Sequence, residues 1–183
     1  MTRFLLTLKT ITLMTVIVSA ADLPDEQSTL RTKDQTSQKV RQYFQAISEG
    51  DMDYVNDFFA DDLQVAVNSK VIQGKKNYID RLKRIREVLF EQIEFGPNHV
   101  HTNYFGLDAI GMSGKTFAEE GLTKPPVWSN AWTTFRAEGR NTKKPIRVPI
   151  HIDFRWEDDK VVNVLIFCDP AFLTAEEAAA VKN

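Results

Sequence analysis

The sequence feature that most constrains the fold is an unbroken alternation of apolar and polar residues from Ile146 to Trp156. The even-numbered positions carry large apolar side chains, and the odd-numbered ones carry arginine, proline, histidine or aspartate. Because successive side chains of a strand point to opposite faces of a sheet, one face of this segment packs on a core and the other is polar. The turn-forming Glu157–Lys160 and the apolar run Val161–Cys168 then predict an antiparallel hairpin.

Helical periodicity dominates the first half of the chain. From Thr36 to Ile47 apolar residues recur at helical spacing, and Gly50 followed by Asp51 supplies a stop and a start. Gly74 opens a third helical pattern. The other predicted segments are strands at Leu63–Val67, Ile93–Phe105 and Val127–Glu138, and a long loop at Gly106–Pro126. This order predicts an α+β fold in which the N-terminal helices pack into the concave face of a curved, mostly antiparallel sheet.

The two ends of the chain differ from this domain, which we place at residues 36–173. Residues 1–20 combine two basic residues, an apolar run and the small residues Val18-Ser19-Ala20, the pattern of a cleavable signal peptide. An uncleaved N-terminal anchor is the alternative, although the apolar run is shorter than the roughly 20 residues that span a bilayer. Residues 21–35 predict a flexible leader, and residues 174–183 a tail or short surface helix capped by Thr174. We therefore expect a secreted or periplasmic protein with no stable membrane span after cleavage.

Charge and reactive side chains narrow the function classes. The 23 basic and 25 acidic residues argue against a nucleic-acid partner, and the basic stretch from Lys75 to Arg86 predicts a solvated helix face. The single cysteine, Cys168, lies in an apolar run and is expected to be a small buried hydrophobe. His99 and His101 have a spacing that metals can use, but no third ligand stands out. We predict neither a metal nor a cofactor.

The order of elements and several local strings resemble the nuclear transport factor 2-like superfamily, which includes ketosteroid isomerase and the SnoaL-like polyketide cyclases. The strings are Tyr43–Asp62, Gly74, Phe154–Trp156 with the following EDDK, and Asp169–Pro170. The resemblance covers residues 36–173 and implies a cone-shaped, cystatin-like α+β barrel with a pocket between helices and sheet. It also implies a homodimer, which in this superfamily often forms through the convex side of the sheet.

The resemblance to ketosteroid isomerase is incomplete at the positions that carry its chemistry. Tyr43 matches a tyrosine that holds the oxyanion in those enzymes. The general-base position falls on Val67, and the position of the second acid falls on Ile152. Since valine cannot accept a proton and isoleucine cannot donate a hydrogen bond, we expect no ketosteroid isomerase activity. The catalytic residues, if any, stay unassigned.

Two sets of candidate site residues follow. The pocket candidates are Tyr43, Asn68, Trp128, Asn130, Trp132 and Asp169. The two tryptophans and Asn130 share one strand face, which would form a flat apolar slot if that face is concave. The alternative for these residues and for Tyr43 is packing in the core. The alternative for Asp169 is a role in a turn or as a helix cap. The interface candidates are Arg147, His151, Asp153 and Arg155, which alternate with the apolar row; an acid–base pair of His151 and Asp153 is the alternative.

We thus expect an exported pocket protein that binds a small, largely apolar molecule, with isomerase- or cyclase-type acid–base chemistry left open. The alternative is a non-catalytic, dimeric binding or interaction module.

Overall fold

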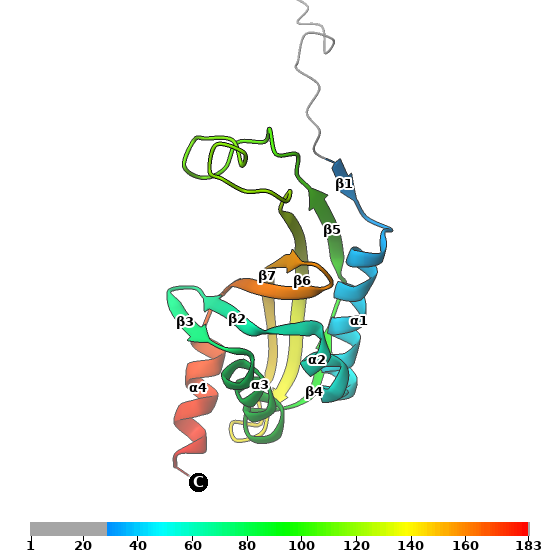
Figure 1. Ribbon diagram of the computed structural model, residues 1–183. Coiled ribbons are helices and arrows are strands. Elements are labelled where there is room, and N and C mark those ends of the chain that lie inside the picture. Colours follow the sequence, from blue (N-terminus) through cyan, green and yellow to red (C-terminus); the bar gives the residue numbers. More distant parts are fainter. Residues whose placement is uncertain (1–28, 183) are drawn as a thin grey trace, which may run out of the picture.

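The computed structural model of the chain describes residues 29–182, within which eight strands form one sheet (Figure 1). The strand order is β1-β5-β6-β7-β8-β2-β3, and β4 pairs with β6 off this path. All pairs are antiparallel except β2 with β8. The strands are β1 (Thr29–Arg31), β2 (Phe59–Val67), β3 (Lys70–Gln73), β4 (Phe90–Phe95), β5 (His99–Tyr104), β6 (Val127–Gly139), β7 (Pro145–Glu157) and β8 (Lys160–Cys168). The predicted α+β class with a mostly antiparallel sheet is confirmed.

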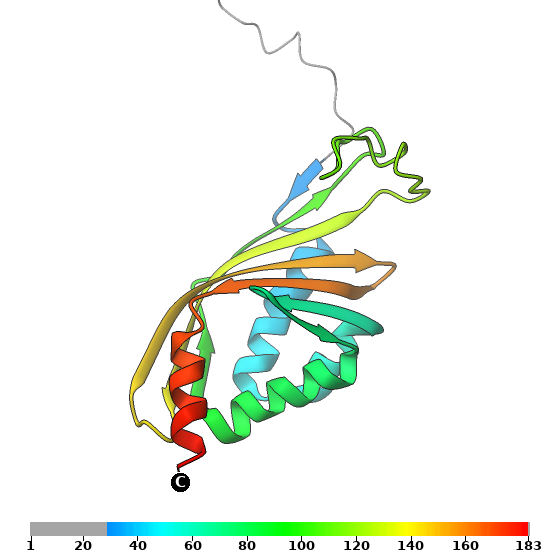
Figure 2. The ribbon, with the colours of Figure 1, turned by 90° about the vertical axis from the view of Figure 1, so that its left-hand side faces the viewer.

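The helices lie inside the curve of this sheet, as Figure 2 shows for α1, α3 and α4. They are α1 (Gln35–Glu49), α2 (Met52–Phe58), α3 (Lys75–Arg84), continued by the π-helical turn η2 (Ile85–Leu89), and α4 (Ala171–Ala180). Gly50 ends α1 with a left-handed φ of 84°, and the Asp51 carboxylate then accepts a hydrogen bond from the first turn of α2. The predicted stop and start are therefore confirmed. None of the helices in residues 29–182 is long and apolar enough to cross a membrane.

The core fills the space between α1, α2 and the concave face of the sheet. Its centre is aromatic: the ring of Tyr43 stacks on Phe58 at 4.7 Å and meets the edge of Phe154 at 5.5 Å. The even-numbered residues of β7 from Ile150 to Trp156 are buried, whereas the odd-numbered ones are not. The alternation that defines this strand in the sequence is thus the division between core and outer face.

The N-terminal boundary of the domain differs from the prediction. The predicted signal peptide and most of the predicted leader lie outside the described residues. Within the leader, Thr29–Arg31 form β1 and pair antiparallel with β5, so this part of the chain extends the sheet. The Ser37 hydroxyl also donates to the carbonyl of Arg31 at 3.2 Å, which joins β1 to α1. The described part of the leader is therefore a structured edge.

The C-terminal prediction also needs a correction. A helix is present, but it begins at Ala171 after Pro170, whose constrained φ of −79° suits a helix start. Thr174 is therefore not the cap; its hydroxyl donates to the carbonyl of Pro170 at 3.2 Å inside the first turn. The helix is also more than a surface tail, because Glu176 is buried and Phe172 packs against the ring of Phe90.

Candidate functional site

A cavity of about 110 Å³ lies between the concave face of the sheet and the helices. Its wall is largely apolar: β7 contributes Ile150 and Ile152, β6 contributes Phe135, and α4 contributes Phe172 and Leu173. These side chains come from elements far apart in the sequence, so the cavity is a product of the fold. Val67 and Ile152, which the sequence resemblance matches to the acids of ketosteroid isomerases, both line it.

Two tyrosine hydroxyls meet at the cavity wall. The hydroxyl oxygens of Tyr43 on α1 and Tyr78 on α3 lie 3.5 Å apart, and each side chain is 3% exposed. Burial raises the pKa of both hydroxyls, that of Tyr43 well above its ordinary value of 10.0. Both are therefore protonated at neutral pH. Because their separation exceeds the roughly 2.5–3.0 Å of a normal hydroxyl hydrogen bond, the pair has capacity to donate to a ligand oxygen.

The charged groups of the wall are two arginines. Arg86 donates from Nη1 to the carbonyls of Ile47 and Ser48, at 2.8 Å and 3.3 Å, and so binds the end of α1. Within residues 29–182, the guanidinium of Arg81 makes no hydrogen bond or ion pair. These placements correct the prediction that the whole basic stretch is a solvated face.

The thiol of Cys168 also lines the cavity, so this half-buried side chain is apolar wall. Burial, and then the charge of the Asp169 carboxylate, raise its pKa, and the nearby Arg81 acts in the opposite direction. The net direction is upward, so the group is a thiol at neutral pH.

Of the predicted pocket residues, Tyr43 lines the cavity, whereas Asn68 and Asp169 do not. The Asn68 amide donates to the carbonyl of Cys168 at 2.9 Å and accepts from its N–H at 3.2 Å, which ties β2 to the end of β8. The Asp169 carboxylate accepts from the N–H of Ala171 at 2.9 Å, where α4 begins. Both side chains satisfy backbone groups next to the cavity, and the prediction is corrected accordingly.

Trp128, Asn130 and Trp132 lie on the opposite, convex face of β6. The residues that face inward on this strand are the odd-numbered ones, including the buried Ser129 and Ala131. The inward Ser129 hydroxyl is paired with the hydroxyl of Thr102 at 2.8 Å and accepts from the Trp156 indole at 2.9 Å. The prediction that the tryptophan face lines the cavity is therefore corrected.

The convex face gathers all the histidines of the described chain around Trp132. The ring of His101 stacks on the indole at 5.3 Å, and the rings of His151 and His99 lie 4.5 Å and 5.7 Å from it. Asp153 accepts from Nε2 of His151 at 2.6 Å and from the Asn130 amide at 2.5 Å. We call this set the convex cluster; its members are His99, His101, Asn130, Trp132, His151, Asp153 and Phe167.

The predicted interface residues all lie on this face. Arg147, His151, Asp153 and Arg155 occupy the outward positions of β7, and Arg155 pairs with Glu157 at 2.8 Å. His151 and Asp153 do form a hydrogen-bonded pair, but it lies across the sheet from the cavity. Within residues 29–182, no group of three or more His, Cys, Asp or Glu side chains is placed to hold a metal ion.

Sequence reasoning missed two residues of the site, Tyr78 and Arg81. The helical pattern after Gly74 places Tyr78 on the apolar side of the third helix and Arg81 on its solvated side, and assigns neither to a site. The available signal is their separation of three positions, which brings two side chains to the same region of a helix surface.

Comparisons with known proteins support the fold. No protein-family model matches the chain, and no curated protein matches it. Among solved structures, an NTF2-like protein of unknown function from Burkholderia pseudomallei is 12% identical with a TM-score of 0.56, covering 78% of this chain and 96% of that one. A ketosteroid isomerase-like protein from Catenulispora acidiphila, in complex with trimethylamine, is 10% identical with a TM-score of 0.54, covering 76% and 92%. A candidate polyketide cyclase from Silicibacter sp. TM1040 is 14% identical with a TM-score of 0.55, covering 76% and 92%. By this architecture the chain has the fold of the nuclear transport factor 2-like superfamily.

Proposed function

We propose that the protein binds a small, largely apolar molecule in the cavity and that the Tyr43–Tyr78 pair donates a hydrogen bond to an oxygen of that ligand. The observation that carries this proposal is an apolar cavity with two buried, protonated hydroxyls in its wall. An apolar cavity of about 150 Å³ is enough to bind benzene, so the 110 Å³ here suits a compact molecule of at most about that size. The ketosteroid isomerase-like protein from Catenulispora acidiphila, which has a similar fold, was solved with the small molecule trimethylamine bound.

The lining favours binding over acid–base turnover. The positions that match the isomerase acids carry Val67 and Ile152, and both side chains are part of the apolar wall. The tyrosines supply donors, but in the described chain no Asp, Glu or His lines the cavity as a general base. General acid–base groups each contribute roughly 10²–10⁴-fold in rate. We therefore expect isomerisation of a 3-oxo-Δ5-steroid to stay near background.

An NMR titration with cyclohexanone tests the binding proposal. The ketone should shift amide signals of α1, α3 and β7 in the wild type, and Tyr43→Phe or Tyr78→Phe should weaken binding about 2- to 10-fold, the value of one neutral hydrogen bond. Ile152→Phe, which fills the cavity, should abolish the shifts. Trp132→Ala, on the opposite face of the sheet, is the control and should bind normally. Equal binding by the wild type and a folded Ile152→Phe variant, or no binding at all, would contradict the proposal.

A second function is favoured by the exposed aromatic side chains of the convex cluster. Trp132 is 45% exposed and Phe167 is 50% exposed, on neighbouring sides of His151. Large apolar groups that gather on one exposed face are typical of interaction surfaces. We therefore propose that this face, with the interface residues predicted on β7, associates with a second copy of the chain.

Sedimentation velocity distinguishes this second function. The wild type should sediment as a dimer, and Trp132→Ala combined with Phe167→Ser should shift it toward the monomer without changing cyclohexanone binding. A wild type that is monomeric at every concentration tested would rule the interface out.

We also propose export, with the mature chain beginning after the predicted signal peptide. The support for this is the pattern of residues 1–20.

A further inference from the structure

The cavity contains one cation whose hydrogen-bonding capacity is unused. Arg86 is committed to the carbonyls of Ile47 and Ser48, whereas Arg81 makes no hydrogen bond or ion pair within residues 29–182. A guanidinium has five N–H donors in a planar fork, and none of the Arg81 nitrogens is buried without a partner, so the donors that no protein group uses face water. Apart from the two arginines, the residues that line the cavity are apolar or neutral, so none of them carries an opposite charge.

Arg81 lines the cavity together with Tyr78 and Cys168. Its charge acts on the hydroxyl of Tyr78, three residues before it on α3, and on the thiol of Cys168 at the end of β8. Both of these groups line the cavity. Because residues three apart on a helix lie on the same side, Tyr78 and Arg81 line the same part of the cavity, where one ligand group could contact both.

The neighbouring carboxylate does not occupy this place. Asp169 also acts on Cys168, but its side chain accepts from the N–H of Ala171 at the start of α4. The donors of Arg81 thus remain available to an anion that enters the cavity.

We propose that the ligand is a monocarboxylate with a compact apolar body, whose carboxylate accepts from Arg81 and from the Tyr78 hydroxyl. This inference rests on the proposed function and narrows its ligand. The planar fork of arginine matches the two oxygens of a carboxylate, and one free cation neutralises one negative charge. The volume limits the apolar body to about one small ring or a short branched chain.

Isothermal titration of the full chain with benzoate and benzamide tests the inference, because the two molecules have nearly the same shape and differ in charge. Isobutyrate extends the series to a smaller body, and cyclopentanecarboxylate to a non-planar ring of similar size. We expect the best-fitting acid to bind at least about 10-fold more tightly than its amide, as charge-assisted hydrogen bonds are stronger than neutral ones. Arg81→Gln should remove that preference and leave amide binding within about 2-fold.

Arg84→Gln is the matched control, because Arg84 is an exposed arginine on the same helix and should leave all affinities unchanged. Arg81→Lys keeps the charge but not the fork, and should retain only part of the preference. It also serves as the second variant if Arg81→Gln does not fold.

The outcomes separate the two proposals. If cyclohexanone binds while no acid of the series binds better than its amide, the carboxylate inference is overturned and the cavity proposal stands. The carboxylate inference is also overturned if Arg81→Gln and Arg84→Gln weaken acid binding equally. If neither cyclohexanone nor any acid or amide binds, both proposals fail.

Discussion

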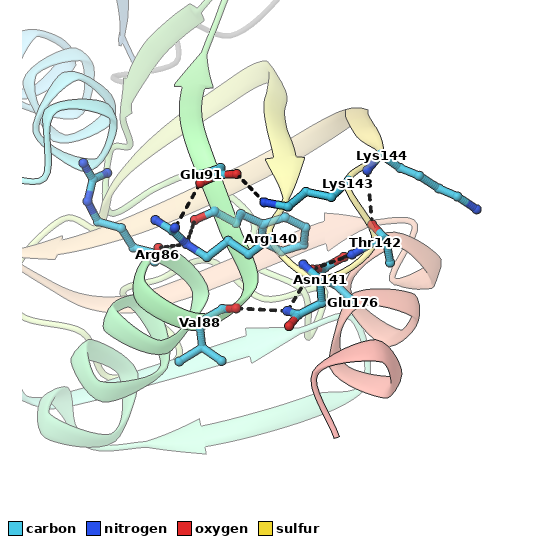
Figure 3. A network of polar contacts seen from close by, with 10 residues as sticks. Arg86, Val88, Glu91, Arg140, Asn141, Thr142, Lys143, Lys144 and Glu176 are labelled. Atoms are coloured by element: carbon cyan, nitrogen blue, oxygen red, sulfur yellow. Dashed lines mark hydrogen bonds and ion pairs between the residues drawn. The ribbon is translucent and has the colours of Figure 1, made fainter. Parts of the chain in front are cut away.

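Replacing Glu176 with alanine should detach α4 from the rest of the domain, because this carboxylate binds the turn between β6 and β7 (Figure 3). Glu176 is 1% exposed. Its Oε1 accepts from the backbone N–H of Asn141 and from the Asn141 amide, the latter at 2.9 Å, and Thr142 N–H lies 3.3 Å from both oxygens. The substitution removes the acceptor of all these donors at once.

The magnitude follows from the number and kind of hydrogen bonds. A hydrogen bond to a charged group contributes about 1.5–3 kcal/mol, and the two backbone donors of the turn recover part of this from water once α4 is released. We therefore expect Glu176→Ala to lower the free energy of unfolding by about 3 kcal/mol. For a chain of this size that corresponds to a fall in Tm of about 6–12 °C.

The effect of Glu176 should depend on pH in one direction. Burial pushes the pKa of the carboxyl up, but the hydrogen bonds from Thr142 and Asn141 outweigh it and hold the pKa below its ordinary value of 4.5. A carboxyl with a lowered folded-state pKa stabilises the fold above the unfolded-state value and loses that contribution as pH falls through the folded-state value. The difference between wild type and variant should thus be constant near neutral pH and shrink below about pH 4.

Thermal unfolding followed by circular dichroism measures both quantities, with Glu177→Ala, the adjacent acidic residue, as the control. A fall in Tm no larger than that of the control, or a difference that grows in acid, would refute the role assigned to Glu176 in this turn.

Three further predictions concern other parts of the chain. Burial, and then the charge of His99, hold the pKa of His101 below its ordinary value of 6.5. The stability of the fold should therefore fall as pH drops through about 6.5, and His101→Gln should reduce this pH dependence in thermal melts. Gly50→Ala should destabilise the fold by more than about 1 kcal/mol in the same melts, because φ is 84° and the new Cβ would lie 2.6 Å from the Arg86 side chain. N-terminal sequencing of the exported protein should begin at Ala21 or Asp22, and a mature chain that still starts at Met1 would contradict the signal peptide.

The strand faces show how far the sequence could be interpreted. On β7 every inward position is large and apolar, so the pattern alone separates core from outer face. On β6 the outward positions carry Trp128 and Trp132, and the inward ones include Ser129 and Thr133, so hydrophobicity favours the wrong face. The inward hydroxyls are tolerated because Ser129 accepts from the Trp156 indole at 2.9 Å and Thr133 donates to Asn98 at 2.5 Å. These partners are distant in the sequence, and only the register of the sheet brings them together.

The third helix shows a different limit. Its apolar stripe and its start after Gly74 were predictable, and the structure confirms the helix from Lys75. What the pattern could not supply is which charged residue at the edge of the stripe points toward the cavity. That choice depends on where β8 ends, since Cys168 and Arg81 approach each other only in the folded chain.

The apolar residues at Val67 and Ile152 bear on the proposal that the cavity binds an anion. A buried carboxylate at either position would need a cation to pair with its negative charge. Arg81, which has no ion pair of its own, would be a candidate for that cation. With valine and isoleucine there, no Asp or Glu lines the cavity, and Arg81 makes no ion pair within residues 29–182. The lining therefore has no carboxylate that could abstract a proton, but it has the tyrosine hydroxyls and Arg81 as donors. A ligand that brings its own negative charge supplies what the wall lacks, and a neutral ligand of the same shape satisfies only the tyrosines.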